Sequence, residues 1–338
     1  MTISQDVSAP LVLVTLATGA QGGSVIKALS ESDKPYRIRG LTRDTSKPAS
    51  QALAKKGVEV VAVDVKLENK DAVQKTFQGA TFAFLVTMSA VMSSKAVEIA
   101  EGKMYIDAAK AENVKLTIWS GLENMSIHSN GKYVNVDHFD AKAAVTEYAK
   151  EVGLLFVNVE PSVYMQNYLT FGPPRKQGDG TYVVANVAAP ESVVPMIDMA
   201  NDYGLFVRKA IESPGVSEVY AHGEVISYTE VVKQLSEITG KKVAYVQITT
   251  EQFEQGLTSS GFPEHSAKEV SEMFNSIAEF GCQYNLSVIE EAGVNAAFVP
   301  SYLDFGNKDI KSSLEGLVRP PRTWAEFVKA SDWSAVLN

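Results

Sequence analysis

Apolar residues form six short runs in the first half of the chain, and segments with helical spacing separate them. The runs are 11–15, 36–41, 58–63, 81–87, 116–120 and 154–159. The clearest helical segments are 50–56, 71–77, 95–111 and 141–151. Such runs are typical of strands that are covered on both faces. Their alternation with helices predicts an α/β fold, a Rossmann-type doubly wound parallel sheet, in which ligands bind beyond the carboxyl ends of the strands.

The pattern changes after residue 165. Short strands with glycine and proline fill 171–195. The remainder is mostly helical, with one helix capped by Thr229 and another that a capping box at Ser266 opens and Gly281 ends. We expect a Rossmann domain over 1–165, to which parts of 190–225 return, and a smaller, mostly helical lobe over 166–338. The cleft between them is the expected ligand site.

A glycine-rich turn follows the first strand and supplies the first candidate site. Thr18, Gly19, Ala20, Gln21 and Gly22 lead from the strand into a helix. A strand, a glycine turn and a helix N-terminus together favour the binding of a pyrophosphate. The usual motif begins with glycine three residues before Gly19. This chain has Leu16 there, whose side chain should narrow the first turn.

The end of the second strand indicates which dinucleotide is bound. Arg43 lies 24 residues after Gly19, where a guanidinium pairs with a 2′-phosphate and an acidic residue would bind a ribose hydroxyl. The prediction is therefore NADP(H), unless Arg43 is a solvated surface residue or pairs with Asp44. Asp64 and Thr87 end the third and fourth strands and are further cofactor-binding candidates.

Candidate catalytic residues follow the fifth strand. Ser120 ends it, and His138 and Lys142 share one face of the next helix. Short-chain dehydrogenases have a tyrosine and a lysine at this spacing, so His138 replaces the tyrosine. His138 is a candidate proton donor, although a lone histidine at a helix start more often has a capping or packing role. Tyr133 is a second candidate donor. With Tyr164 and Asn167, the residues Ser120, His138 and Lys142 should line the cleft.

Composition limits the partners. The chain has 338 residues and a net charge of −9, which disfavours direct binding to nucleic acid or an anionic membrane. The single cysteine, Cys282, excludes an internal disulfide, and the histidines lack metal-ligand spacing, so no metal site is expected. No secretory signal or membrane-length apolar run is visible, which predicts a cytoplasmic or nuclear protein.

Several segments resemble the NmrA-like family, which is related to short-chain dehydrogenases. The matching segments are Thr18–Val25, Thr42–Arg43, Ser120–Asn124, His138–Lys142, Tyr164–Asn167, Pro195–Asp198 and Thr249–Phe274. The pair Ser-Gly-Leu-Glu-Asn and His-Phe-Asp-Ala-Lys is far more specific than the glycine turn. The resemblance implies an NADP(H)-binding domain and a second lobe.

Two functions follow from this resemblance. Sensor-type members report the NADPH/NADP⁺ ratio to protein partners such as transcription factors, and the missing tyrosine favours that function here. The alternative is an NADPH-dependent reductase of small carbonyl, enone or aryl substrates, in which Lys142, with its pKa lowered by burial, supplies the acid or base. Lys142 is also expected to hold the nicotinamide ribose. A homodimer remains an open option.

Overall fold

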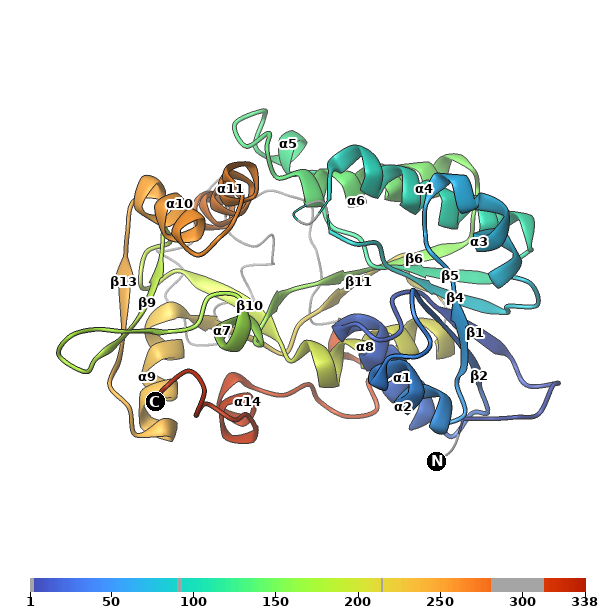
Figure 1. Cartoon of the computed structure of the whole chain (residues 1–338), viewed down its shortest axis with the longest axis horizontal. Helices are drawn as coiled ribbons and strands as arrows, with labels where there is room; N and C mark the ends of the chain where they lie inside the picture. The colour runs from blue at the N-terminus through green and yellow to red at the C-terminus, as the bar shows by residue number, and fades with distance from the viewer. Residues whose placement is uncertain (1–2, 90, 92, 214, 281–312) are drawn as a thin grey trace.

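A seven-stranded parallel sheet forms one half of the molecule in the computed structural model, which describes residues 3–89, 91, 93–213, 215–280 and 313–338 (Figure 1). Its strands are β1 (Leu11–Val14), β2 (Arg37–Thr42), β3 (Glu59–Ala62), β4 (Phe82–Leu85), β5 (Leu116–Trp119), β6 (Phe156–Pro161) and β11 (Glu218–Ala221). They lie in the order β11-β6-β5-β4-β1-β2-β3. The order reverses beside β1, as in a doubly wound sheet, and the predicted Rossmann fold is confirmed.

Helices cover both faces of this sheet. The helices around it are α1 (Ala20–Ser30), α2 (Pro48–Lys55), α3 (Lys70–Thr76), α4 (Lys95–Ala111), α5 (Met125–His128), α6 (Asp137–Glu151) and α8 (Met199–Glu212), with a short 3-10 turn at Leu67–Asn69. Figure 1 shows α3, α4 and α6 above the sheet and α1 and α8 below it. Each layer has its own apolar core against the strands. Burial on both faces explains why the central strands β1, β4 and β5 read as continuous apolar runs.

The chain returns to the sheet after its excursion into the second lobe. Helix α8 packs along α1, and β11 pairs with the edge of β6. The two helices meet at Gly204, whose N–H donates to Ser24 Oγ at 2.9 Å. A Cβ at Gly204 would lie 2.1 Å from the Ser24 carbonyl oxygen, so glycine permits this close approach.

The second lobe contains two small sheets as well as helices. The strands are β7 (Val163–Tyr164), β8 (Arg175–Lys176), β9 (Tyr182–Asn186), β10 (Val193–Ile197), β12 (Glu224–Ser227) and β13 (Val243–Gln247), in the orders β12-β10-β7 and β13-β9-β8. The helices are α7 (Asn167–Thr170), α9 (Tyr228–Thr239), α10 (Thr250–Ser259), α11 (Glu264–Phe280) and α14 (Trp324–Ala330). An aromatic core around Trp324 joins α9, α14 and these sheets. None of the described helices meets the length and hydropathy that a membrane span requires.

Two expected helix starts are wrong. Helix α11 begins at Glu264, so Ser266 lies inside it and its hydroxyl donates to the Val91 carbonyl instead of capping. Ser227 caps α9, while the Thr229 hydroxyl donates to the Pro190 carbonyl. The expected helix end at Gly281, and Cys282, lie outside the described residues.

Candidate functional site

The glycine turn places the start of α1 at the carboxyl end of β1. Gly19 is the N-cap, and Thr18, Gly19 and Ala20 are exposed. Because the first N–H groups of a helix have no partner within it, this end of α1 is a ready anion site. A Cβ at Gly22 would lie 2.4 Å from the Leu16 carbonyl oxygen, so Gly22 is needed for close packing of helix on strand.

Leu16 adopts the left-handed conformation that the usual motif assigns to glycine. Its φ is 45°, and its carbonyl accepts a hydrogen bond from Gly19 N at 2.8 Å. The side chain packs against the apolar core on the α1 side of the sheet. The turn therefore keeps its shape at a conformational cost on the order of 1 kcal/mol.

Gln21 links this turn to the second lobe. Its Nε2 donates to the hydroxyl of Tyr164 on β7 at 2.8 Å, and burial raises the pKa of Tyr164 to about 12. The Gln21 Oε1 atom, also buried, has no hydrogen-bond partner among the described residues. The start of α1 is thus in direct contact with β7, the strand that follows β6 in the chain.

Arg43 is exposed at the carboxyl end of β2 and makes no ion pair within the described parts of the chain. Asp44 bonds instead to the backbone and side chain of Ser46, and these hydrogen bonds lower the pKa of Asp44. The guanidinium is thus available to an anion. Asp64, at the end of β3, is exposed and pairs with Lys66 at 2.7 Å.

Lys142 lies in a buried polar cluster at the ends of β4 and β5. Its ammonium is 2.9 Å from Glu98 Oε1 and donates to Thr87 Oγ1 at 3.1 Å. Thr87 Oγ1 in turn donates to Glu98 Oε1 at 2.8 Å. The exposed fractions of the Lys142 and Glu98 side chains are 8% and 0%. Lys142 also lies 5.2 Å from the centre of the Trp119 ring.

Glu98 is the functional candidate that the sequence does not reveal. It stands in the first turn of α4, where a carboxylate normally faces solvent and favours the helix dipole. Only the fold brings it to Lys142, which is 44 residues away. A buried carboxylate therefore balances the positive charge of the Lys142 ammonium. The sequence-based hypothesis had assumed burial without such a partner.

Glu98 also affects a neighbouring carboxyl group. Burial, together with repulsion from Glu98 and Asp64, raises the pKa of Glu101 to about 7.

His138 and Tyr133 face helix α11 of the second lobe. Glu269 Oε1 lies 2.8 Å from both the backbone N and the Nδ1 of His138. The Tyr133 hydroxyl donates to Glu279 at 2.6 Å, and burial and this carboxylate raise the pKa of Tyr133. Both candidate proton donors are therefore engaged by carboxylates from the opposite lobe.

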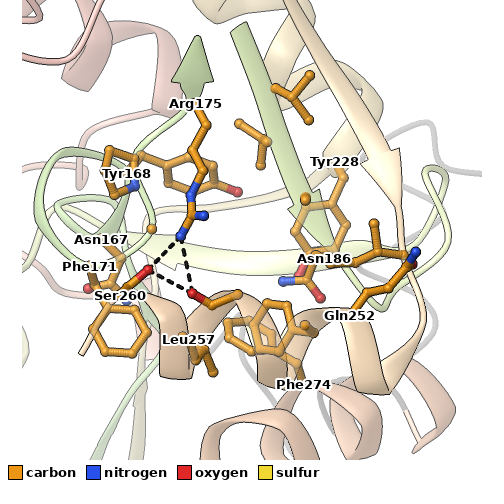
Figure 2. A pocket seen from close by; sticks show the side chains of 18 of the residues that line it. Asn167, Tyr168, Phe171, Arg175, Asn186, Tyr228, Gln252, Leu257, Ser260 and Phe274 are labelled. Carbon is orange, nitrogen blue, oxygen red and sulfur yellow. Dashed lines mark hydrogen bonds between the residues drawn. The ribbon is translucent and has the colours of Figure 1, made fainter. Parts of the chain in front are cut away.

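The five residues expected in one cleft occupy different places. Ser120 is fully buried beside the hydroxyl of Tyr203. Lys142 belongs to the Glu98 cluster, His138 contacts α11 and Tyr164 contacts α1. Asn167 lines a cavity of about 300 Å³ in the second lobe, which Figure 2 shows from close by. The other four are not among the residues lining that cavity.

The carboxyl edge of the sheet fits a dinucleotide with a 2′-phosphate. It has an open helix N-terminus, a close-packing Gly22 and the unpaired Arg43. Buried polar atoms without partners among the described residues also collect there, namely Gln21 Oε1, Asn158 Oδ1 and Ser162 Oγ. Because buried polar atoms are normally hydrogen-bonded, such a group indicates a place where a ligand completes the network.

The family model for the NmrA-like family matches residues 8–327. The chain belongs to the NmrA-like family. An NmrA-like domain-containing oxidoreductase, malD of Malbranchea aurantiaca, is 28% identical over 72% of this chain and 77% of its own. An NAD(P)H azoreductase of Xenophilus azovorans is 28% identical over 95% of this chain and 97% of its own.

Solved structures confirm the NmrA-like fold. NmrA, a negative transcriptional regulator solved with NADP, superposes with a TM-score of 0.69 at 19% identity over 95% of each chain. An NADPH-dependent quinone oxidoreductase of Escherichia coli, solved with NADPH, gives 0.70 at 21% identity, covering 94% of this chain and 98% of its own. At these identities the likeness shows the fold alone.

Proposed function

We propose that this NmrA-like protein is an NADPH-dependent reductase of small conjugated acceptors such as enones, quinones or aryl compounds. The observation that carries the proposal is the buried cluster of Lys142, Glu98 and Thr87 at the carboxyl ends of β4 and β5. Maintaining a charged pair out of water is costly, so its placement at the ligand edge favours a chemical role. The relatives from Malbranchea aurantiaca and Xenophilus azovorans are both oxidoreductases.

Different residues of the chain would bind the cofactor and donate the proton. The start of α1, with Gly19 to Gly22, would hold the pyrophosphate, and Arg43 would hold the 2′-phosphate. The bound NADPH supplies a hydride, and the acceptor also needs one proton. The Lys142 ammonium has three N–H donors and uses two of them on Glu98 and Thr87. The third would donate to a ribose hydroxyl or to the acceptor.

The sensor function that the missing tyrosine favours is the second candidate. Its support is the fold shared with NmrA, a negative transcriptional regulator. That likeness is at 18% identity, whereas oxidoreductases match this chain at 28%. We therefore place the reductase first.

The test is NADPH oxidation against a panel of quinones, enones and azo compounds. Lys142→Met alone would leave Glu98 buried and unpaired, a change that costs about 3–5 kcal/mol of stability. The informative variant is Lys142→Met with Glu98→Gln, which removes both charges. We expect turnover to fall about 10²–10⁴-fold while NADPH still binds.

Lys150→Met is the matched control, since Lys150 lies on the same helix and pairs with Glu147 at an exposed site. It should keep full turnover. Wild-type protein that binds NADPH yet reduces nothing in the panel would reject the reductase and favour the sensor.

A further inference from the structure

The second-lobe cavity has walls that are mainly apolar. It lies between β9, α7, α10 and the start of α9, and encloses about 300 Å³. Aromatic rings from several elements line it, among them Tyr168, Phe171, Tyr228, Phe253 and Phe274. Phe253 and Phe274 meet edge to face, with ring centres 5.5 Å apart. The volume is at the lower end for small-molecule sites, and such walls favour a planar aromatic ligand of one or two fused rings.

The cavity lining carries positive charge and no negative charge among the described residues. The chain carries 40 acidic residues, yet no aspartate or glutamate is among the described residues lining the cavity. Arg175 on β8 is the charged side chain of that lining. It donates to neutral oxygens, Ser260 Oγ at 2.7 Å and the Gly256 carbonyl at 3.4 Å, and forms no ion pair with a described carboxylate (Figure 2).

The cavity lining also includes donors that make no hydrogen bond among the described residues. Asn186 is buried, and its Oδ1 accepts from the backbone N–H of Val187 and Ala188. Its Nδ2 amide makes no hydrogen bond within the described chain. The Asn167 side chain, which also lines the cavity, likewise makes no hydrogen bond within the described chain. An exposed guanidinium and free amide donors, in a mainly apolar lining without a described carboxylate, complement an anion on an aromatic ring.

The cavity is connected to the glycine turn through one short segment. Val163 and Asn167 line the cavity, and Tyr164 between them accepts a hydrogen bond from Gln21. The segment that lines the cavity is thus in contact with the turn that is expected to hold the pyrophosphate.

We infer that this cavity binds planar aromatic anions, carboxylates or sulfonates of one or two rings, with Arg175 receiving the charge. The inference concerns binding alone and does not depend on the proposed reductase function, since Lys142 is not among the residues lining this cavity. The net charge of −9 repels anions at long range, but salt screens that repulsion beyond about 8 Å, so the local guanidinium decides.

The test compares 2-naphthoate with 2-naphthamide, a neutral probe of the same shape, by calorimetric titration of the full chain. The wild type should bind the acid about tenfold or more tightly than the amide, as expected for a charge-assisted hydrogen bond. Arg175→Gln should abolish that preference and leave the affinity for the amide nearly unchanged. Lys176→Gln, the same loss of charge on the next residue of β8, should keep it.

A cavity-filling variant tests the location. An added Cβ at Gly256 on α10 meets no atom within 4 Å, so Gly256→Leu fits the helix and takes up space in the cavity. Both probes should lose binding about tenfold or more in this variant.

Equal affinity of the wild type for acid and amide, no binding of either, or a preference that survives in Arg175→Gln would overturn the inference. Tight naphthoate binding without NADPH turnover on any acceptor would reject only the reductase.

Discussion

Arg43 is the side chain on which the choice of dinucleotide depends. It is exposed and unpaired among the described residues, at the strand end where a 2′-phosphate would lie. Arg43→Ala should weaken NADPH binding by about 10- to 150-fold, because a charged hydrogen bond contributes about 1.5–3 kcal/mol. NADH binding should be unchanged. Fluorescence titration with the two reduced nucleotides measures both affinities.

Arg37→Ala is the control, since Arg37 starts the same strand and bonds to the Ala9 carbonyl at 3.1 Å, away from the ligand edge. Equal NADPH affinity in wild type and Arg43→Ala would contradict the assignment of NADP(H).

Glu160 makes the stability of the fold depend on pH. Burial first, and then repulsion from Glu218, raises the pKa of this β6 carboxyl to about 8, while Asn158 Nδ2 donates to it at 2.9 Å. Because the folded state holds a proton that the unfolded chain releases above about pH 4.5, its contribution is full at low pH and is lost as pH rises toward 8. The unfolding free energy should fall by about 1 kcal/mol per pH unit between pH 6 and 7.

Glu160→Gln should remove most of that decline, because the amide keeps the acceptor for Asn158 without a proton to lose. Urea unfolding at pH 6 and at pH 8 gives the comparison. The same slope in both proteins would assign the pH dependence to other groups, with Glu101 the next candidate.

At the scale of single residues, the sequence identifies sites by their place in a motif. Gly22, Arg43 and Lys142 are recognisable because strand ends and helix spacing give their positions. Glu98 and Glu269 are not, since each reads as an ordinary helical glutamate and gains its partner through tertiary contact. Leu16 shows a different limit of the sequence. The motif predicts that its side chain narrows the turn, but not that its backbone adopts a φ of 45° and keeps the shape of the turn.

Two helical glycines differ in what surrounds them. A methyl group at Gly204 would collide with α1, at 2.1 Å from the Ser24 carbonyl oxygen, whereas Gly256 on α10 has open space. Gly204→Ala should destabilise the protein by about 1–3 kcal/mol through overpacking. Gly256→Ala should stabilise it by about 0.5–1 kcal/mol, because alanine loses less entropy in a helix.

Thermal unfolding of the two variants beside the wild type provides the measurement, with each expected to shift the midpoint in its own direction. A stable Gly204→Ala protein would mean that α1 and α8 can move apart without cost.

At the scale of elements, apolar runs predict the six strands β1 to β6, most clearly for the central β1, β4 and β5, because a strand covered on both faces has no polar side. The seventh, β11 (Glu-Val-Tyr-Ala), is as long as β3 (Glu-Val-Val-Ala), but it lies outside the strand–helix alternation of the first half, because the chain reaches it only after entering the second lobe. A capping pattern gives the wrong helix start when the helix already begins before that pattern. Ser266 and Glu269 have capping-box spacing, yet α11 already begins at Glu264, and both side chains contact other segments instead.

At the scale of the whole molecule, the first lobe is built from two separate parts of the chain, because α8 and β11 join it after the chain has entered the second lobe. A fragment ending at residue 165 lacks α8 and β11, so it would expose the apolar side of α1 and the edge of β6. We expect this fragment to show no cooperative thermal transition by circular dichroism and no NADPH binding, in contrast to the full chain. A sharp transition with bound NADPH would show that the first 165 residues suffice.

The late return of the chain has a consequence for synthesis. β6 ends at Pro161 and its neighbour β11 begins at Glu218, 57 residues later. At about 5–20 residues per second, a ribosome needs roughly 3–11 s to produce that interval. Throughout it, the nascent chain presents an unpaired strand edge and an apolar helix face, both of which favour association with other chains. The protein should therefore depend on chaperones most strongly while residues 162–221 are being made.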